Sequence, residues 1–328
     1  MTMRAWRVAD WCAPEDMSLE TVERPEPGPG EALVKVRYAA LNFFDGLMIG
    51  GKYQVKPERP FTPGCEMAGV VVAVGEGARV AVGDRVCGQP GWGAFAEYCV
   101  MPADELRPVP DAIDLKHAAC VPVVYPTAHI ALRRRGQLAE GETLLVTAAA
   151  GGVGIAAVQL GKAWGAEVIA LAGGPEKCRI AKEQGADHAL DYTAGPGWVD
   201  TVRELTNGDG VDVIFDPVGG ETFDLALKVL AFEGRAVIIG FAGGEIQKIA
   251  ANRLLLKNAS AVGAIWGGYS RRAPGYSQEV VDDCFRMMAD GAITPAISGV
   301  YPLSETPAAL AALDTRKTWG KLVIDIDA

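Results

Sequence analysis

The hydrophobic positions in the first part of the chain, up to about Tyr125, form short runs separated by turn residues. Gly and Pro clusters such as residues 27–30 lie between these runs, which are rich in Val. Short apolar runs bounded by such clusters are typical of antiparallel strands. We therefore expect residues 1–125 to form a small antiparallel barrel. The expected strands are residues 32–36, 69–74 and 85–87.

The rhythm changes in the middle of the chain, where short apolar runs alternate with helical stretches. Such alternation predicts a parallel sheet, so we expect an α/β domain over residues 126–262. The last region, residues 263–328, is irregular and ends in a helix near 306–317 and a strand over 321–326. The expected strands of the middle domain are residues 143–148, 167–172, 188–192, 211–218 and 235–240. Its expected helices are residues 152–164 and 175–184.

Composition and charge exclude several classes of function. The 328 residues are 49% hydrophobic and 22% charged, which is a globular profile long enough for two domains. No apolar run approaches the ~20 residues that cross a bilayer, and the amino terminus lacks the apolar core of a secretory signal, so we expect a cytoplasmic protein without a membrane partner. A formal net charge of −10 disfavours nucleic acid. The seven cysteines include no Cys-x-x-Cys pair, which indicates neither a disulfide framework nor a zinc knuckle.

The most informative motif is the glycine-rich turn over residues 147–154, which follows an expected strand and begins an expected helix. In that context glycines let the backbone approach a pyrophosphate, and the amides at the helix start face its oxygens. Ala149 stands where the usual dinucleotide fingerprint has its first glycine. The expected cofactor-binding residues of this turn are Ala150, Gly151, Gly152, Val153 and Gly154.

The identity of the dinucleotide depends on the turn at the end of the next strand, Gly173-Gly174. An enzyme for NAD usually has Asp or Glu there to accept hydrogen bonds from the ribose hydroxyls. This turn has no carboxylate of its own, which leaves room for a 2′-phosphate. Lys177 and Tyr192 follow and together can bind a phosphate as a charge and a hydrogen-bond donor. The sequence therefore predicts NADPH, bound at Gly173, Lys177 and Tyr192.

Several segments together resemble the quinone oxidoreductase branch of the medium-chain dehydrogenases, to which the eye-lens zeta-crystallins belong. The resemblance covers nearly the whole chain. It implies a Rossmann domain, a doubly wound parallel sheet, inserted in a GroES-like β-barrel domain. It also implies a homodimer and a substrate cleft between the domains. The resembling segments are residues 41–45, 63–71, 149–154, 185–192, 216–220, 251–258 and 320–323.

The departures from the related zinc alcohol dehydrogenases concern the metal ligands. At two positions where those relatives have catalytic zinc ligands this chain has Asn42 and Cys65, and the third has no obvious match. Asn is a poor zinc ligand, although Cys65, Glu66 and Asp45 could supply some ligands. The four-cysteine lobe of the structural zinc is missing from residues 89–97. We therefore expect no metal, and a substrate that does not need a Lewis acid.

The expected substrate is a quinone or another conjugated carbonyl compound, whose developing oxyanion needs only hydrogen-bond donors. Asn42 and Tyr53 are the candidate catalytic residues. Tyr53 could also deliver a proton, although a loop aromatic that covers the barrel would explain it equally well. Asp45, Trp266 and Tyr269 are expected to line the substrate pocket. The resemblance adds cofactor-binding positions at Thr127, Gly219, Gly240, Phe241 and Arg316.

Three functions remain open from the sequence. The first is an NADPH-dependent quinone reductase. The second is an NADPH-dependent reductase of activated C=C bonds in enones, acrylate-type acids or enoyl thioesters, which uses the same cofactor step. The third is a protein that binds NADPH without catalysis. The histidines at positions 117, 129 and 188 show neither metal spacing nor a Ser-His-Asp arrangement, so a hydrolase has no support.

Overall fold

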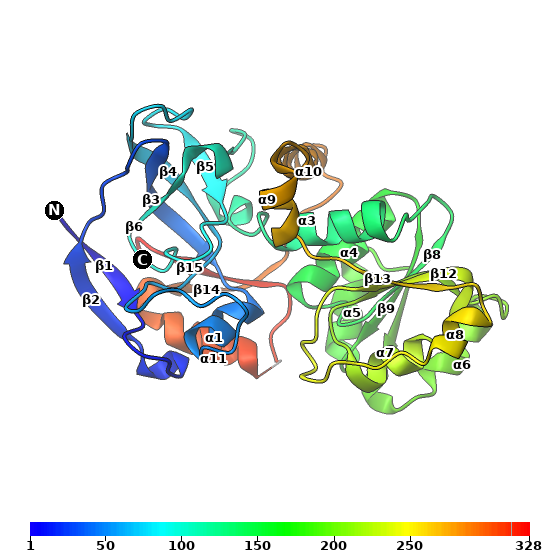
Figure 1. Ribbon diagram of the computed structural model, residues 1–328. Helices are drawn as coiled ribbons and strands as arrows, with labels where there is room; N and C mark the ends of the chain where they lie inside the picture. The colour runs from blue at the N-terminus through cyan, green and yellow to red at the C-terminus, as the bar shows by residue number, and fades with distance from the viewer. Residues whose placement is uncertain (316) are drawn as a thin grey trace. The chain divides into compact units, whose positions relative to one another are not determined.

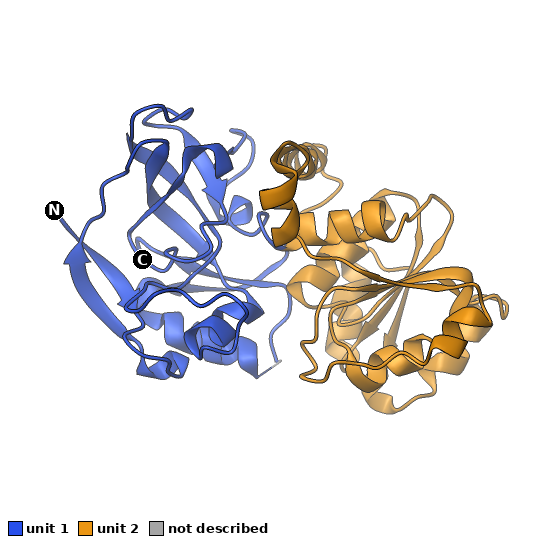
Figure 2. Ribbon diagram, in the orientation of Figure 1, with its two compact units in different colours: residues 1–123, 295–328 blue, residues 124–294 orange. Residues whose placement is uncertain are grey.

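The computed structural model describes residues 1–315 and 317–328, which form two compact units (Figures 1 and 2). The first unit consists of residues 1–123 and 295–328, and the second of residues 124–294. The chain therefore leaves the first unit once, builds the whole second unit, and then returns. No helix in the described part of the chain is both long enough and apolar enough to cross a bilayer.

The first unit is built around a seven-stranded sheet with the order β14-β15-β3-β4-β5-β7, in which β6 also pairs with β3. Most pairs are antiparallel as expected, but β14 and β15 pair in parallel, so the sheet is mixed. A separate antiparallel pair, β1 and β2, completes the strands. The strands are β1 (Thr2–Arg7), β2 (Ser18–Glu23), β3 (Glu31–Ala40), β4 (Met67–Val74), β5 (Arg85–Gly88), β6 (Tyr98–Pro102), β7 (Arg107–Pro108), β14 (Ile297–Pro302) and β15 (Lys321–Asp325). The helices are α1 (Phe43–Ile49), α2 (Leu115–Ala118) and α11 (Thr306–Asp314).

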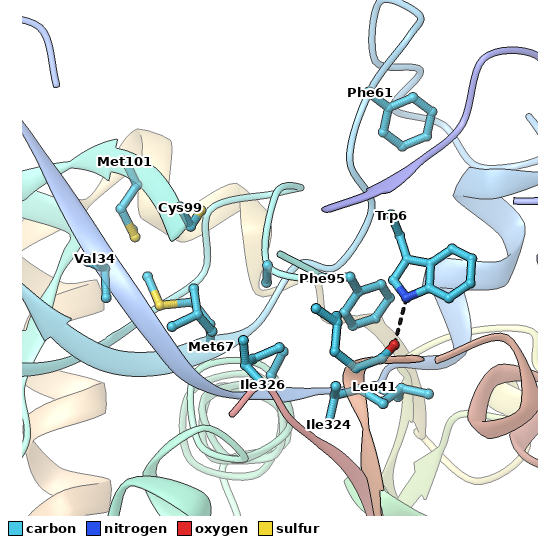
Figure 3. Packing of buried hydrophobic residues seen from close by; sticks show 14 of the residues in the cluster. Trp6, Val34, Leu41, Phe61, Met67, Phe95, Cys99, Met101, Ile324 and Ile326 are labelled. Atoms are coloured by element: carbon cyan, nitrogen blue, oxygen red, sulfur yellow. Dashed lines mark hydrogen bonds between the residues drawn. The ribbon is translucent and has the colours of Figure 1, made fainter. Parts of the chain in front are cut away.

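The core of the first unit joins its amino-terminal and carboxy-terminal segments. Val34, Met67 and Ile324 come from three neighbouring strands and are fully buried in one apolar cluster (Figure 3). Trp6 of β1 packs into the same cluster, and its indole nitrogen donates a hydrogen bond to the carbonyl oxygen of Leu303 at 2.7 Å. The first 123 residues therefore need residues 295–328 to complete their core.

The second unit contains a six-stranded parallel sheet with the order β10-β9-β8-β11-β12-β13 among its described residues. This is the strand order of a doubly wound dinucleotide-binding fold, whose order reverses between β8 and β11. The strands are β8 (Thr143–Val146), β9 (Glu167–Ala172), β10 (His188–Asp191), β11 (Val211–Asp216), β12 (Leu230–Ile238) and β13 (Ser260–Gly263). The helices are α3 (Val124–His129), α4 (Gly152–Ala163), α5 (Pro175–Glu183), α6 (Trp198–Leu205), α7 (Gly220–Ala226), α8 (Ala251–Leu255), α9 (Gly267–Arg272) and α10 (Pro274–Ala289).

The division into units differs from the expected domains mainly at the second boundary. The expected first boundary, after residue 125, lies within two residues of the observed one. The expected second boundary, at residue 263, is replaced by one at Pro295. The reason is that β13 is the sixth strand of the parallel sheet and that α10 packs against α3, so residues 263–294 belong to the second unit.

Candidate functional site

The glycine-rich turn between β8 and α4 has the geometry of an anion site. Gly151 caps the amino end of α4, and the first helical residues, Gly152 and Val153, are only half-buried. Gly154 packs so closely that a Cβ there would lie 2.2 Å from the carbonyl oxygen of Ala148. The first turn of a helix that reaches the surface presents free amides and a positive dipole end to a phosphate. The turn therefore suits a pyrophosphate, and Ala150 lies buried behind it.

A buried carboxylate joins this turn to the one after β11. Asp216 accepts hydrogen bonds from the hydroxyl of Thr147 and from the amide of Gly219, the second at 2.8 Å. Burial raises the pKa of Asp216, while these two donors favour its charged form. Thr147 follows β8 and Asp216 ends β11, so the bond between them crosses the point where the strand order reverses. Open α/β sheets bind their ligands at that point, and Asp216 fixes both turns there.

The turn after β9 brings together two of the residues expected at the 2′-phosphate. A Cβ on Gly173 would lie 2.9 Å from the hydroxyl oxygen of Tyr192, so these two residues are neighbours. Lys177 is half-buried in the first turn of α5, and burial lowers its pKa. The structure adds an acidic neighbour that the sequence-based prediction did not include. Asp191 ends the adjacent strand β10, and its carboxylate accepts a hydrogen bond from the amide of Gly174 at 2.9 Å.

The other expected cofactor-binding residues lie at the carboxyl ends of the strands or in α3. Gly240 and Phe241 follow β12, and the ring of Phe241 lies 3.5 Å from the position of a Cβ on Gly219. The loop after β12 therefore packs on the turn after β11. Thr127 is half-buried in α3. Arg316 lies outside the described residues.

Two aromatic residues expected at the substrate pocket lie at the start of α9 in the second unit. Trp266 is buried immediately before the helix. The ring of Tyr269 lies 5.6 Å from that of Tyr276, and the guanidinium of Arg134 lies over both rings, 5.2 and 4.3 Å from their centroids. Tyr269 is therefore held by cation–π contacts within its own unit.

In the first unit, the expected catalytic residue Asn42 lies in a cluster of buried polar groups that we call the lysine cluster: Leu41, Asn42, Glu66 and Lys321. The ammonium of Lys321 donates to the carbonyl oxygen of Leu41, to Asn42 Oδ1 and to Glu66 Oε2, each at 2.8 Å. Asn42 Nδ2 donates to the same Glu66 oxygen at 2.9 Å. The amide of Asn42 is thus oriented by a cation on one side and a carboxylate on the other.

The charge of Lys321 is compensated within this cluster. Burial lowers the pKa of Lys321, but the attraction of the Glu66 carboxylate and its hydrogen bond to the ammonium outweigh this effect, and the pKa lies above its usual value. The second carboxylate oxygen of Glu66 accepts from the amide of Val123 at 2.7 Å. The pair is therefore a buried, hydrogen-bonded ion pair, which is stable only while both partners are present.

Asp45 and Cys65 lie beside the lysine cluster. Asp45 Oδ2 accepts from the amide of Asn42 at 2.7 Å and so closes the first turn of α1, but its Oδ1 accepts no hydrogen bond of normal geometry from a described residue. Burial raises the pKa of Asp45 to about 7. Burial also raises the pKa of the Cys65 thiol well above its usual range, so Cys65 remains a protonated packing residue. Within residues 1–315 and 317–328, no group of three or more His, Cys, Asp and Glu is placed to hold a metal ion.

Tyr53, the second catalytic candidate, follows α1 and stacks on Phe44 with ring centroids 5.1 Å apart. The residue is half-buried. Burial raises its pKa, and the nearby Cys65 and Asp45 add to the effect. Its phenol therefore stays protonated at neutral pH and can donate a hydrogen bond.

The sequence-based reading missed the role of Lys321. The signal available in the sequence is that a lysine begins an apolar strand. A lysine buried there requires a partner for its charge, so the pattern indicates an ion pair. The partners themselves are not predictable from local sequence, since Asn42 and Glu66 lie 279 and 255 positions away.

Comparisons with known proteins agree with this arrangement. The family model of the alcohol dehydrogenase GroES-like domain matches residues 28–111, and that of the zinc-binding dehydrogenases matches residues 152–282. The chain is 40% identical to quinone oxidoreductase-like protein 2 of Bos taurus over 309 residues, which cover 94% of this chain and 88% of the relative. It is 40% identical to prostaglandin reductase-3 of Mus musculus over 222 residues, 67% of this chain and 58% of the relative. Its fold is similar to that of Escherichia coli quinone oxidoreductase complexed with NADPH, with a TM-score of 0.90, 28% identity, and coverage of 98% of this chain and 100% of that one.

Proposed function

The chain belongs to the zinc-independent quinone oxidoreductase branch of the medium-chain dehydrogenase/reductase superfamily, and from this membership we propose that it is an NADPH-dependent reductase of quinones. The observation that carries the proposal is the lysine cluster. Asn42 and Glu66 are engaged by the ammonium of Lys321, a cation that belongs to the chain itself. A first unit whose buried polar groups are occupied by an internal ammonium suits a substrate that conjugation has already polarised, because such a substrate needs only hydrogen-bond donors for its developing oxyanion.

The second unit supplies the proposed cofactor site. The amides at the start of α4 would bind the pyrophosphate, and Lys177 and Tyr192 beside Gly173 would bind the 2′-phosphate. NADPH, when bound, supplies a hydride to the substrate. In the balanced reaction, NADPH, one further proton and a quinone give NADP⁺ and the hydroquinone.

The first unit supplies the proposed hydrogen-bond donor. Tyr53 remains a neutral phenol because burial raises its pKa, so it can donate to the oxygen on which negative charge develops. Direct contact of Asn42 with the substrate stays a prediction, and Lys321 and Glu66 fix the orientation of its amide. We assign Asn42 the task of holding the start of α1, which precedes Tyr53.

Reduction of activated C=C bonds is a second candidate. It is supported by the similarity to prostaglandin reductase-3, and it needs the same hydride step with delivery to the β-carbon. NADPH oxidation should be followed with p-benzoquinone, with a simple enone and with an enoyl thioester, in the presence and absence of a chelator. The proposal expects the highest kcat/KM with the quinone, unaffected by the chelator. Turnover with the enone or thioester alone would replace it by the second candidate, and turnover with none would contradict both.

We also propose that the protein is a homodimer. β13 pairs only with β12 among the described strands, so its other edge is free, and exposed apolar side chains flank it in the sequence at Leu255, Leu256 and Ile265. A free strand edge with exposed apolar neighbours is a surface that a second copy can cover. Light scattering after gel filtration should give the mass of a dimer, and Leu255→Glu with Leu256→Glu should lower it to that of a monomer. A parent protein with the mass of a monomer would contradict this proposal.

A further inference from the structure

Tyr53, the proposed hydrogen-bond donor, lies in a loop without helix or strand. The loop follows α1 and comprises residues 50–60, and we call it the Tyr53 loop. Most of its side chains are exposed, at positions 52, 54–56 and 58–60. Loops with so little packing of their own move more than the elements that they connect. The direction of the Tyr53 phenol therefore depends on its stacking with Phe44 and on the contacts that hold the loop.

Both ends of the Tyr53 loop are bound to the segment that follows β1. At the far end, Val8 and Phe61 exchange two main-chain hydrogen bonds, of 2.9 and 3.2 Å. Phe61 is also buried in the core cluster of the first unit (Figure 3). At the near end, the amide of Cys12 donates to the carbonyl oxygen of Ile49 at 3.3 Å. Residues 8–12 therefore join the two ends of the loop.

Trp11 lies in this segment, and its indole packs against residues from both ends of the loop. Gly51 has φ of 65°, and a Cβ there would lie 2.7 Å from the indole Cδ2, so only glycine leaves room for the ring. At the other end, the guanidinium of Arg59 lies 4.6 Å from the centroid of the indole, a cation–π distance, and the ring centroid of Phe61 lies 6.2 Å from it. The indole thus holds the loop two residues before Tyr53 and again where the loop ends.

We propose that Trp11 is a positioning residue for the reduction: its indole holds the Tyr53 loop in the conformation in which the phenol can donate to the developing oxyanion. The inference rests on the proposed role of Tyr53. Trp11 acts through the backbone of the loop and not on the reacting atoms. Such an indirect role can matter because a hydrogen bond depends on direction, and a misplacement of about 1 Å can cost about a hundredfold in rate.

The test is a double-mutant cycle between Trp11→Ala and Tyr53→Phe, which removes the hydroxyl and keeps the ring. The rate constant of NADPH oxidation in a single turnover is measured with the best substrate of the panel described above. The matched control is Trp164→Ala. Trp164 is also half-buried, and the guanidinium of Arg133 lies 4.3 Å from its ring centroid, but it ends α4 in the second unit.

Trp11→Ala should lower the rate constant about tenfold, and Tyr53→Phe about a hundredfold. The double variant should be no slower than Tyr53→Phe, because without the hydroxyl there is no donor left to misplace. The dissociation constant of NADPH should stay at the parent value, since the proposed cofactor site lies in the second unit. Trp164→Ala should react as fast as the parent.

A rate for Trp11→Ala equal to that of the parent, or the same tenfold loss in the Tyr53→Phe background, would overturn the inference and leave the role of Tyr53 intact. A Tyr53→Phe variant as fast as the parent would overturn the inference together with that role. A parent protein that reduces no substrate of the panel would overturn the proposed function as well.

The order of the loop can be measured without turnover. Trypsin can cut the Tyr53 loop only after Lys52, because Lys56 and Arg59 each precede a proline. Trp11→Ala should lose protection at the bond after Lys52, and Trp164→Ala should keep it. Protection in Trp11→Ala equal to that of the parent would contradict the proposal.

Two further variants guard against misfolding. Trp11→Phe keeps an aromatic ring against Gly51 and should recover most of the parent rate. If Trp11→Ala does not fold, Gly51→Ala replaces it, because the new Cβ would push the loop away from the indole. The same loss of rate is then expected, again absent in the Tyr53→Phe background, and a Gly51→Ala variant as fast as the parent would overturn the inference.

Discussion

Replacement of Lys321 by methionine tests how much the lysine cluster contributes to stability. Lys321→Met removes the ammonium and leaves three acceptors, the carbonyl oxygen of Leu41, Asn42 Oδ1 and Glu66 Oε2, without their common donor. The side chain of Glu66 is 0% exposed, so water cannot replace the lost cation. Removal of one partner from a buried ion pair costs about 3–5 kcal/mol. We expect a loss at the lower end, about 3 kcal/mol, because Val123 and Asn42 still donate to Glu66.

The assay is urea unfolding followed by tryptophan fluorescence and by circular dichroism, since two units can unfold separately. Lys35→Met is a matched control in the same sheet, because Lys35 pairs with Asp327 at 3.6 Å with both side chains close to half exposed. Exposed pairs contribute less than about 1 kcal/mol. The double variant Glu66→Gln with Lys321→Met should lose less free energy of unfolding than the two single variants lose together, with a difference of about 1–3 kcal/mol. A loss for Lys321→Met no larger than that for Lys35→Met would refute the reasoning.

Three further predictions concern single residues. Lys177→Ala should weaken NADPH binding by about tenfold, because it removes one charge-assisted hydrogen bond, and should leave NADH binding nearly unchanged. Titrations with both cofactors test this, and equal losses for the two would contradict a role of Lys177 at the 2′-phosphate. Gly154→Ala should abolish tight NADPH binding, because the new Cβ would meet the carbonyl oxygen of Ala148. The control is Gly275→Ala, whose Cβ has open space around it and which should bind NADPH normally in the same titration. Burial raises the pKa of Asp45 from 3.8 to about 7 because it disfavours the charged carboxylate. The contribution of Asp45 to stability is therefore fully present below pH 3.8 and is lost as the pH rises through about 7. Asp45→Asn should therefore gain stability relative to the parent by up to about 2–3 kcal/mol between about pH 5 and 8, and parallel urea midpoints over this range would contradict the shifted pKa.

The fold of the second unit was largely predictable because its signals are local. The strand over Glu167–Ala172 coincides with the expected one, and the glycine-rich turn lies between β8 and α4 as predicted. The helix α10 was missed, although Val280, Cys284 and Met287 are buried on one face with helical spacing. Missing α10 also displaced the expected domain boundary, since this helix belongs to the second unit.

The site was predictable only where function depends on backbone shape or on a motif. Glycines report positions that exclude a side chain, and Gly154 and Gly219 are such positions. The partners of polar side chains depend on distant segments, so the sequence did not indicate that the amide of Asn42 is hydrogen-bonded to Glu66 and Lys321.

The split of the first unit between the two ends of the chain also has a consequence for protein synthesis. Lys321 is made 255 residues after Glu66, and the whole second unit is made between them. At about 5–20 residues per second, the ribosome needs roughly ten to fifty seconds to cover that distance. During this interval β3 has no β15 to pair with, and Glu66 has no cation, so the nascent first unit presents an open strand edge and an uncompensated carboxylate. The second unit is contiguous, so all of its strands are made before the first unit receives its last strand.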